Sequence, residues 1–146
     1  MNDLTPEWLC PRILAVTGDA VLFGDREGKI RYWNAGAEAM FGWAAAEAMG
    51  QSMDIIIPER LRGRHWEGYH RVMATGVTKY GKDLLAVPAA RKDGSSISIE
   101  FTIQMIRADD GTLLGPAAII RDVTARWQRE RETQKRLKEL EAQARR

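Results

Sequence analysis

The sequence has 146 residues, of which 45% are hydrophobic and 29% are charged, with 22 lysine and arginine residues against 20 aspartate and glutamate residues. These values fit one soluble globular domain with a tail, because a domain usually takes about 100 to 150 residues. A length of 146 residues is too short for a kinase catalytic region or a polymerase together with a second folded domain. The single cysteine, Cys10, rules out an intramolecular disulfide and a zinc cluster, which suits a reducing compartment.

The N-terminal segment has neither the basic stretch nor the apolar run of a signal peptide, and no stretch approaches the roughly 20 apolar residues of a membrane span. We therefore expect a cytoplasmic protein without a membrane partner.

Residues 1–120 have a net charge of −2, whereas residues 121–146 have a net charge of +4. Acidic and basic residues alternate at 129–132, as on a solvated helix, so we expect no nucleic-acid partner.

Hydrophobic periodicity and turn residues divide the chain into helices and strands. Pro11 and Pro58 suit the first turn of a helix, and Asn34 is a good helix cap. Apolar runs on both sides of Gly28 predict a β-hairpin, and apolar alternation over 97–105 predicts a long strand. The expected elements are a helix at 11–18, strands at 20–23 and 29–33, helices at 35–40, 44–49 and 58–75, strands at 85–87, 96–105 and 113–123, and a helix at 122–146.

This order of elements predicts an α+β fold. Five antiparallel strands, with helices inserted between the second and the third, form a sheet with one covered face. We expect residues 1–10 to be an extension, residues 11–124 to be the domain and residues 125–146 to be a C-terminal helix.

One face of the longest internal helix is apolar. At about 100° per residue, Leu61, His65, Tyr69 and Val72 share this face, whereas the charged residues mostly lie elsewhere. We therefore expect His65 to point inward and His70 to point outward.

Six short stretches, in this order and spacing, resemble the PAS family of sensory domains over residues 11–124. They are DREGKI at 25–30, WNAGAE at 33–38, FGW at 41–43, EAMG at 47–50, RKDG at 91–94 and RDVT at 121–124. The resemblance implies a PAS fold, in which a five-stranded antiparallel sheet and one long helix enclose an apolar pocket. It also implies that the last strand leads into a helix that transmits a change in the pocket.

Residues 58–76 look like the haem-binding helix of FixL-type oxygen sensors. In this resemblance His65 takes the place of the axial iron ligand, and Arg71 that of a basic residue near the haem propionates. The position that carries a distal arginine in those sensors is Leu85 here, which argues against oxygen-specific chemistry. Haem b, another small ligand or flavin, and no cofactor all stay open. The implied pocket residues are His65, Tyr69, Arg71, Leu85, Leu61, Ile103 and Ile119.

Other PAS chemistries fit the sequence less well. Covalent chromophores need a cysteine that the family places later in the chain than Cys10. Trp33, Trp43 and Trp66 either line a pocket or belong to the core. The sequence has no phosphate-binding loop, no nucleophile elbow and no paired histidines at metal-binding spacing, so we expect no enzyme.

The C-terminal helix is the expected output of the domain. Asp122 and Thr124 are expected to fix the angle at which this helix leaves the sheet. Trp127, Leu137 and Leu140 are its candidates for a coiled-coil dimer, although a solvated terminal helix is the alternative. We expect a stand-alone PAS sensor of gas, redox state or another small ligand, which relays the signal through this helix in a homodimer to an unknown protein, with transcriptional regulation implied by the family. The alternative is a cofactor-free PAS module for protein interaction.

Overall fold

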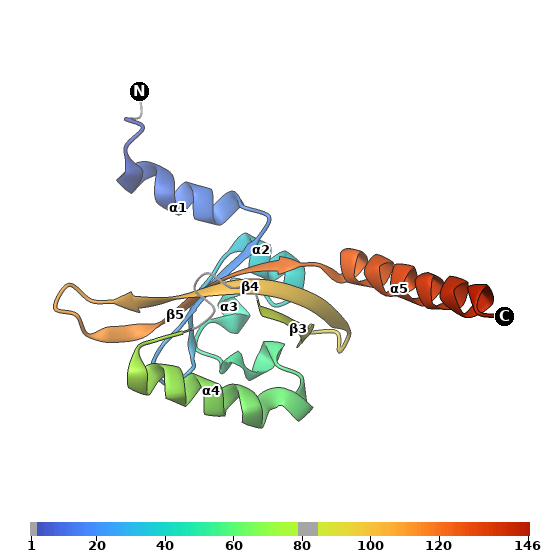
Figure 1. The fold of residues 1–146 in the computed structure, drawn as a ribbon. Helices are drawn as coiled ribbons and strands as arrows, with labels where there is room; N and C mark the ends of the chain where they lie inside the picture. Colours follow the sequence, from blue (N-terminus) through green and yellow to red (C-terminus); the bar gives the residue numbers. More distant parts are fainter. Residues whose placement is uncertain (1–2, 79–84) are drawn as a thin grey trace.

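The computed structural model describes residues 3–78 and 85–146 and shows an α+β fold. A five-stranded sheet carries short helices and one longer helix on one face, as the sequence predicts (Figure 1). The elements are α1 (Pro6–Val16), β1 (Ala20–Gly24), β2 (Ile30–Trp33), α2 (Ala35–Phe41), α3 (Ala45–Ala48), the 3₁₀ turns η1 (Met53–Ile56) and η2 (Glu59–Leu61), α4 (Arg62–Thr75), β3 (Leu85–Ala90), β4 (Ser96–Arg107), β5 (Leu113–Asp122) and α5 (Thr124–Ala144).

All neighbouring strands of the sheet are antiparallel, in the order β2-β1-β5-β4-β3. In the central register Phe101 lies opposite Ile120, and Ile103 lies opposite Ala118. Directly opposed residues point to the same side of a sheet, so these four side chains share one face, here called the inner face. The core lies on this face, and Phe41, Leu22 and Ile30 are its largest fully buried side chains.

The first helix begins earlier than its sequence pattern predicts. The hydroxyl of Thr5 accepts a hydrogen bond from the backbone N–H of Trp8, and Pro6 occupies the first turn. A hydroxyl cap followed by proline starts a helix well, so α1 runs through Pro11 instead of starting there. The expected boundary between residues 10 and 11 therefore falls inside a helix.

Helix α4 starts later than predicted, because the segment that follows Pro58 forms the separate turn η2. It ends at Gly76, which has a left-handed backbone with φ +73°. Figure 1 shows α4 along one side of the sheet, whereas α1 and α5 extend away from the sheet in different directions. Within the described ranges, no helix combines the length and the apolar character that crossing a membrane would require.

Candidate functional site

The inward side of α4 carries the candidate ligand residues. Tyr69 and Met73 are buried against the core, and His65 and Trp66 are partly buried. These residues recur at intervals of three and four, the period that places side chains on one side of a helix. His70 is exposed, as the sequence predicts.

Two polar contacts hold α4 against neighbouring segments. The hydroxyl of Tyr69 donates a hydrogen bond to the backbone carbonyl of Asp25, in the turn between β1 and β2. The indole Nε1 of Trp66 donates to Oδ1 of Asp54 at 2.7 Å. The carbonyl acceptor and burial both favour the neutral phenol, and burial raises the pKa of Tyr69. Tyr69 and Trp66 therefore act first as anchors of the helix.

Burial favours the neutral form of His65, which is the form that binds a metal. Its Nδ1 atom is buried and has no hydrogen-bond partner among the described residues. Burial lowers the pKa of this imidazole, although the nearby Asp54 carboxylate opposes the shift. Its ring centre lies 4.8 Å from that of Trp66 and 5.8 Å from that of Tyr69. A buried polar atom without a partner calls for an explanation, and a bound group is one.

The inner face of the sheet adds an apolar surface on the same side. Ala118 and Ile120 are buried in its centre, whereas four apolar residues toward β3 and β4 are only partly buried. These four are Val87, Phe101, Ile103 and Met105. Apolar side chains that face the helical layer and still retain accessible surface suit a small apolar ligand. An imidazole together with apolar side chains is the kind of residue set that holds an axially ligated haem in proteins.

The structure brings together some of the residues that the sequence assigns to the pocket. His65, Tyr69 and Ile103 lie on the inner side, and Leu61 is partly buried in η2 at the start of the long helix. Arg71 is exposed on α4. Leu85 lies in β3 opposite Phe101, but its side chain lies outside the described residues.

The assignment of Ile119 to the pocket is wrong. Its neighbours Ala118 and Ile120 are buried on the inner face, and successive residues of a strand point to opposite faces. Ile119 therefore lies on the outer face, where it is 51% exposed.

Trp33 belongs to the core and not to a ligand surface. It is buried, its ring centre lies 5.5 Å from that of Phe41, and its Nε1 donates to the backbone carbonyl of Trp43 at 2.9 Å. The ring of Trp43 lies 5.3 Å from the ammonium group of Lys92, which also pairs with Glu47 at 2.6 Å.

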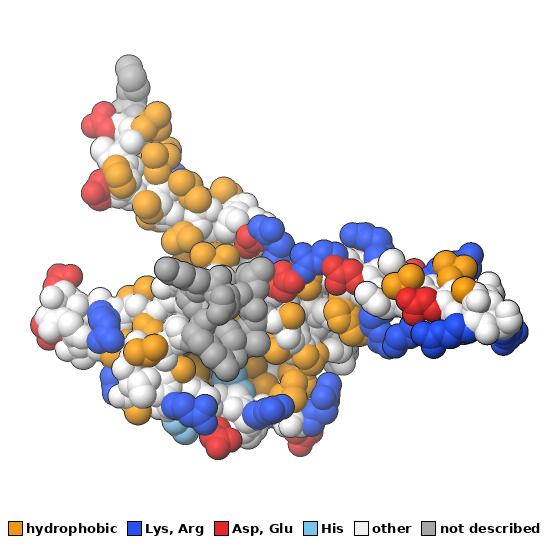
Figure 2. Space-filling view, in the orientation of Figure 1, with side chains coloured by type: hydrophobic (Ala, Val, Ile, Leu, Met, Phe, Trp, Pro, Cys, Tyr) orange, Lys and Arg blue, Asp and Glu red, His pale blue; other side chains and the backbone are white. Residues whose placement is uncertain are grey.

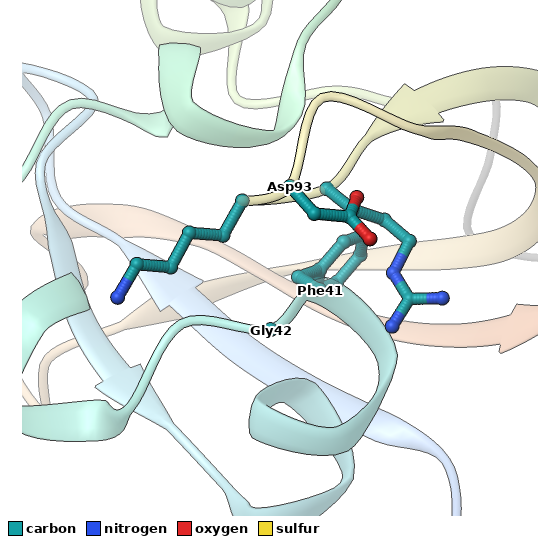
Figure 3. Close-up of a pocket in the computed structure, with 5 residues that line it drawn as sticks. Phe41, Gly42 and Asp93 are labelled. Atoms are coloured by element: carbon teal, nitrogen blue, oxygen red, sulfur yellow. The ribbon is translucent and has the colours of Figure 1, made fainter.

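A hollow of about 370 Å³ lies near this contact, between the end of α2 and the turn that joins β3 to β4. Figure 3 shows Phe41 and Gly42 on one side of the hollow and Asp93 on the other. The backbone N–H of Lys92 donates to the carbonyl of Phe41 at 2.9 Å, so the two segments are joined directly. This hollow is separate from the surface around His65.

Asn34 is buried and does more than cap a helix, which is the role that the sequence predicted for it. Its Oδ1 accepts from the backbone N–H groups of Val21 at 2.8 Å and Ala37 at 2.9 Å. Its Nδ2 donates to the carbonyls of Leu14 at 2.8 Å and Asp19 at 3.1 Å. One side chain thus joins the end of α1, the start of β1 and the start of α2, and all its hydrogen-bonding positions are used.

The start of α5 is joined to the sheet. The hydroxyl of Thr124 accepts from the backbone N–H of Ser98 at 2.9 Å and donates to Asp122 at 2.5 Å. The guanidinium of Arg126 pairs with Glu100 of β4. These contacts place the first turn of α5 against β4.

Beyond this first turn, α5 has no buried residue. Leu137 and Leu140 are each 49% exposed, and Trp127 lies beneath the guanidinium of Arg131 at 4.8 Å.

The chain therefore combines an antiparallel sheet that carries helices on one face, a partly accessible apolar inner surface and a projecting terminal helix. The chain belongs to the PAS family, since the family model described as the PAS fold matches residues 14–128. The resemblance seen in the sequence is thereby confirmed, and so is the fold.

Two curated relatives are sensor proteins. Sensor protein FixL of Bradyrhizobium diazoefficiens is 30% identical over 134 residues, which cover 90% of this chain and 25% of FixL. Oxygen sensor protein DosP of Escherichia coli is 25% identical over 114 residues, which cover 78% of this chain and 14% of DosP. The chain spans a quarter or less of the length of the curated relatives it matches. It is therefore a PAS module of the kind found in sensor proteins.

A solved structure supports the fold. The crystal structure of the PAS domain of a protein from Colwellia psychrerythraea matches with a TM-score of 0.72 at 21% identity, over 83% of this chain and 99% of that chain.

Proposed function

We propose that this PAS module binds a small ligand between α4 and the inner face of the sheet, and that haem b is the ligand class its residues fit best. The observation that carries the proposal is His65, whose buried Nδ1 has no hydrogen-bond partner among the described residues and whose pKa is lowered by burial. An imidazole that stays neutral keeps its lone pair available to a metal. A relative named as an oxygen sensor supports a gas-binding role.

The chain supplies an iron ligand and an apolar surface. His65 would hold the iron, while Phe101, Ile103 and Met105 would contact the macrocycle. A haem bound there would supply an iron centre that binds diatomic gases or changes oxidation state. Arg71 is exposed and would reach propionates at the edge of the site.

The signal would leave through α5. Strand β4 carries Phe101 on its inner face and the neighbouring Glu100 on its outer face, where Glu100 pairs with Arg126 of α5. A ligand that favours one geometry of β4 would therefore favour one direction of α5. Binding would shift the population of molecules from one direction of α5 to the other. In a cytoplasmic homodimer the exposed Leu137 and Leu140 would bring two α5 helices together and present them to a downstream protein.

An absorption spectrum tests haem binding. The protein is mixed with haem and compared with His65→Ala and, as a matched control on the same helix, His70→Ala. We expect a Soret band in the wild type and in His70→Ala, with a loss of at least about tenfold in haem affinity in His65→Ala, which corresponds to about 1.4 kcal/mol. A wild type that binds no haem, or an unchanged band in His65→Ala, would contradict the proposal.

A cofactor-free interaction module is the second candidate function. It is favoured by the anchoring role of Tyr69 and Trp66, because both side chains already have partners within the protein. A protein that binds no haem and still associates through its helices would support this candidate.

A further inference from the structure

Two buried N–H groups at the hollow between α2 and the turn from β3 to β4 have no acceptor. The Nε atom of Arg91 and the Nε1 atom of Trp43 are buried, and neither has a hydrogen-bond partner among the described residues. Arg91 lines the hollow, and Trp43 directly follows Gly42, which also lines it. A buried donor without an acceptor costs free energy, so two of them close to one hollow call for an explanation. A ligand that supplies acceptor atoms is such an explanation.

The hollow is large enough for a small molecule. Its volume of about 370 Å³ lies at the lower end of the range for small-molecule sites. Phe41 and Gly42 lie on one side of it, and Asp93 lies on the other (Figure 3). Arg91 and Lys92 complete the lining and carry aliphatic stems as well as positive charges. This lining suits a molecule that has one charged group on a compact apolar body.

The arginine indicates which charged group the ligand carries. The ammonium of Lys92 is already paired with Glu47 at 2.6 Å, so Lys92 has an acceptor within the protein. The Nε of Arg91 has none among the described residues. Nε–H and the neighbouring Nη–H of a guanidinium point side by side, which matches the two oxygens of a carboxylate. Arg91 therefore favours a carboxylate as the charged group.

Asp93 limits the number of negative charges that the ligand can carry. Hydrogen bonds from Ser95, together with the charge of Arg91, lower the pKa of Asp93, so this side chain is a carboxylate at neutral pH. A second negative charge on the ligand would lie close to it and be repelled. The hollow therefore favours a ligand with a single carboxylate over a dicarboxylate, a sulfate or a phosphate.

We propose that this hollow is a second binding site, which takes a small monocarboxylate whose oxygens accept hydrogen bonds from the Nε side of Arg91, beside the indole of Trp43. The inference goes beyond the proposed haem function and does not depend on His65, because His65 does not line the hollow. The ligand would lie between α2 and the hairpin of β3 and β4. These segments are already joined by the bond from the N–H of Lys92 to the carbonyl of Phe41, and the ligand would hold them together more firmly.

Nuclear magnetic resonance with benzoate as the probe tests this site. In the isotope-labelled full chain, the Nε1–H of Trp43 and the Nε–H of Arg91 give signals that a bound carboxylate would shift. The test variant is Arg91→Lys, which keeps the positive charge and removes the side-by-side donors. The matched control, Arg136→Lys, is taken from the exposed lysine and arginine side chains that Figure 2 shows along the projecting α5. The spread of the backbone amide signals shows that each variant is folded.

We expect benzoate to shift both signals of the wild type in a saturable way. Read from the Trp43 signal, the benzoate affinity of Arg136→Lys should equal that of the wild type, and that of Arg91→Lys should be at least about tenfold lower. Equal affinity in Arg91→Lys, or a wild type without saturable shifts, would overturn the proposal.

Succinate and sulfate test the choice of ligand class. Both carry two negative charges, so we expect each to bind at least about tenfold more weakly than benzoate. Sulfate that shifts the same signals with the affinity of benzoate would overturn the monocarboxylate site and indicate an adventitious ion only. Shifts confined to the surroundings of His65 would also overturn it. The Soret band reports haem binding separately, so failure at this hollow leaves the haem proposal intact.

Discussion

At the scale of single residues, the polar side chains of Asn34 and His65 differ in whether their hydrogen-bonding atoms have partners within the protein. Asn34 uses both acceptor positions and both donor positions within the protein. His65 keeps a buried Nδ1 atom that has no partner in the described part of the chain. The first arrangement stabilises the fold, whereas the second costs stability unless something else is bound.

The pH dependence of stability tests this environment of His65. Burial lowers the pKa of His65 in the folded protein, so the unfolded chain takes up a proton first as the pH falls below about 6.5. The contribution of His65 to stability is therefore constant at higher pH and decreases below that value. We expect the urea midpoint of His65→Gln to fall less than that of the wild type between about pH 7.5 and about pH 5.5.

The matched control for this experiment is His70→Gln, which removes the exposed histidine of the same helix and leaves His65 in place, so the part of the pH dependence that His65 causes should remain. Parallel pH profiles for His65→Gln and the wild type would show that the imidazole is not desolvated.

At the scale of elements, α4 and the turn between β1 and β2 fit closely. Gly28 has a left-handed backbone with φ +82°, and a Cβ atom placed on it would lie 2.1 Å from the ring of Trp66. A Cβ on Gly24 would lie 2.9 Å from the hydroxyl of Tyr69. Both aromatic anchors of α4 therefore rest on glycines of this hairpin.

Substitution of Gly28 by alanine tests this contact. The glycine at 94, in the turn between β3 and β4, is a matched control because its φ is +86° and a Cβ there would meet nothing within 4 Å. We expect Gly94→Ala to cost about 1 kcal/mol for the left-handed backbone alone. Gly28→Ala should cost about 2 kcal/mol more, because Trp66 must move. Urea unfolding measures both, and equal losses would contradict the contact.

The strength of the local signals explains which elements the sequence predicts. The alternation along β4 and the turn glycines identify the sheet, because both follow from local geometry. The turn η1 has no such period and was not predicted. In β5 the run from Leu113 to Ile120 is almost continuously apolar, so periodicity does not show which face each residue takes, and Ile119 was assigned to the wrong one. The helical wheel places His65 inward, but the lack of a partner for its Nδ1 within residues 3–78 and 85–146 depends on tertiary structure.

At the scale of the whole molecule, the bond between Ser98 and Thr124 joins the sheet to its output helix. Thr124→Val keeps the shape of the side chain and removes the acceptor of the Ser98 amide hydrogen. We expect hydrogen exchange of the Ser98 amide to become about tenfold faster, since loss of one such bond is worth about 1.4 kcal/mol of local opening. Thr133→Val is the control, because the hydroxyl of Thr133 bonds only within α5, to the carbonyl of Arg129. Unchanged exchange at Ser98 would contradict this link.

The two open edges of the sheet have a consequence for assembly. Strand β3, at one edge, contains Pro88, which has no N–H to offer to an approaching strand. Strand β2, at the other edge, is four residues long and carries the charged Arg31. Neither edge is a good template for strand addition. Copies of this protein at high concentration should therefore resist growth into extended β-fibres.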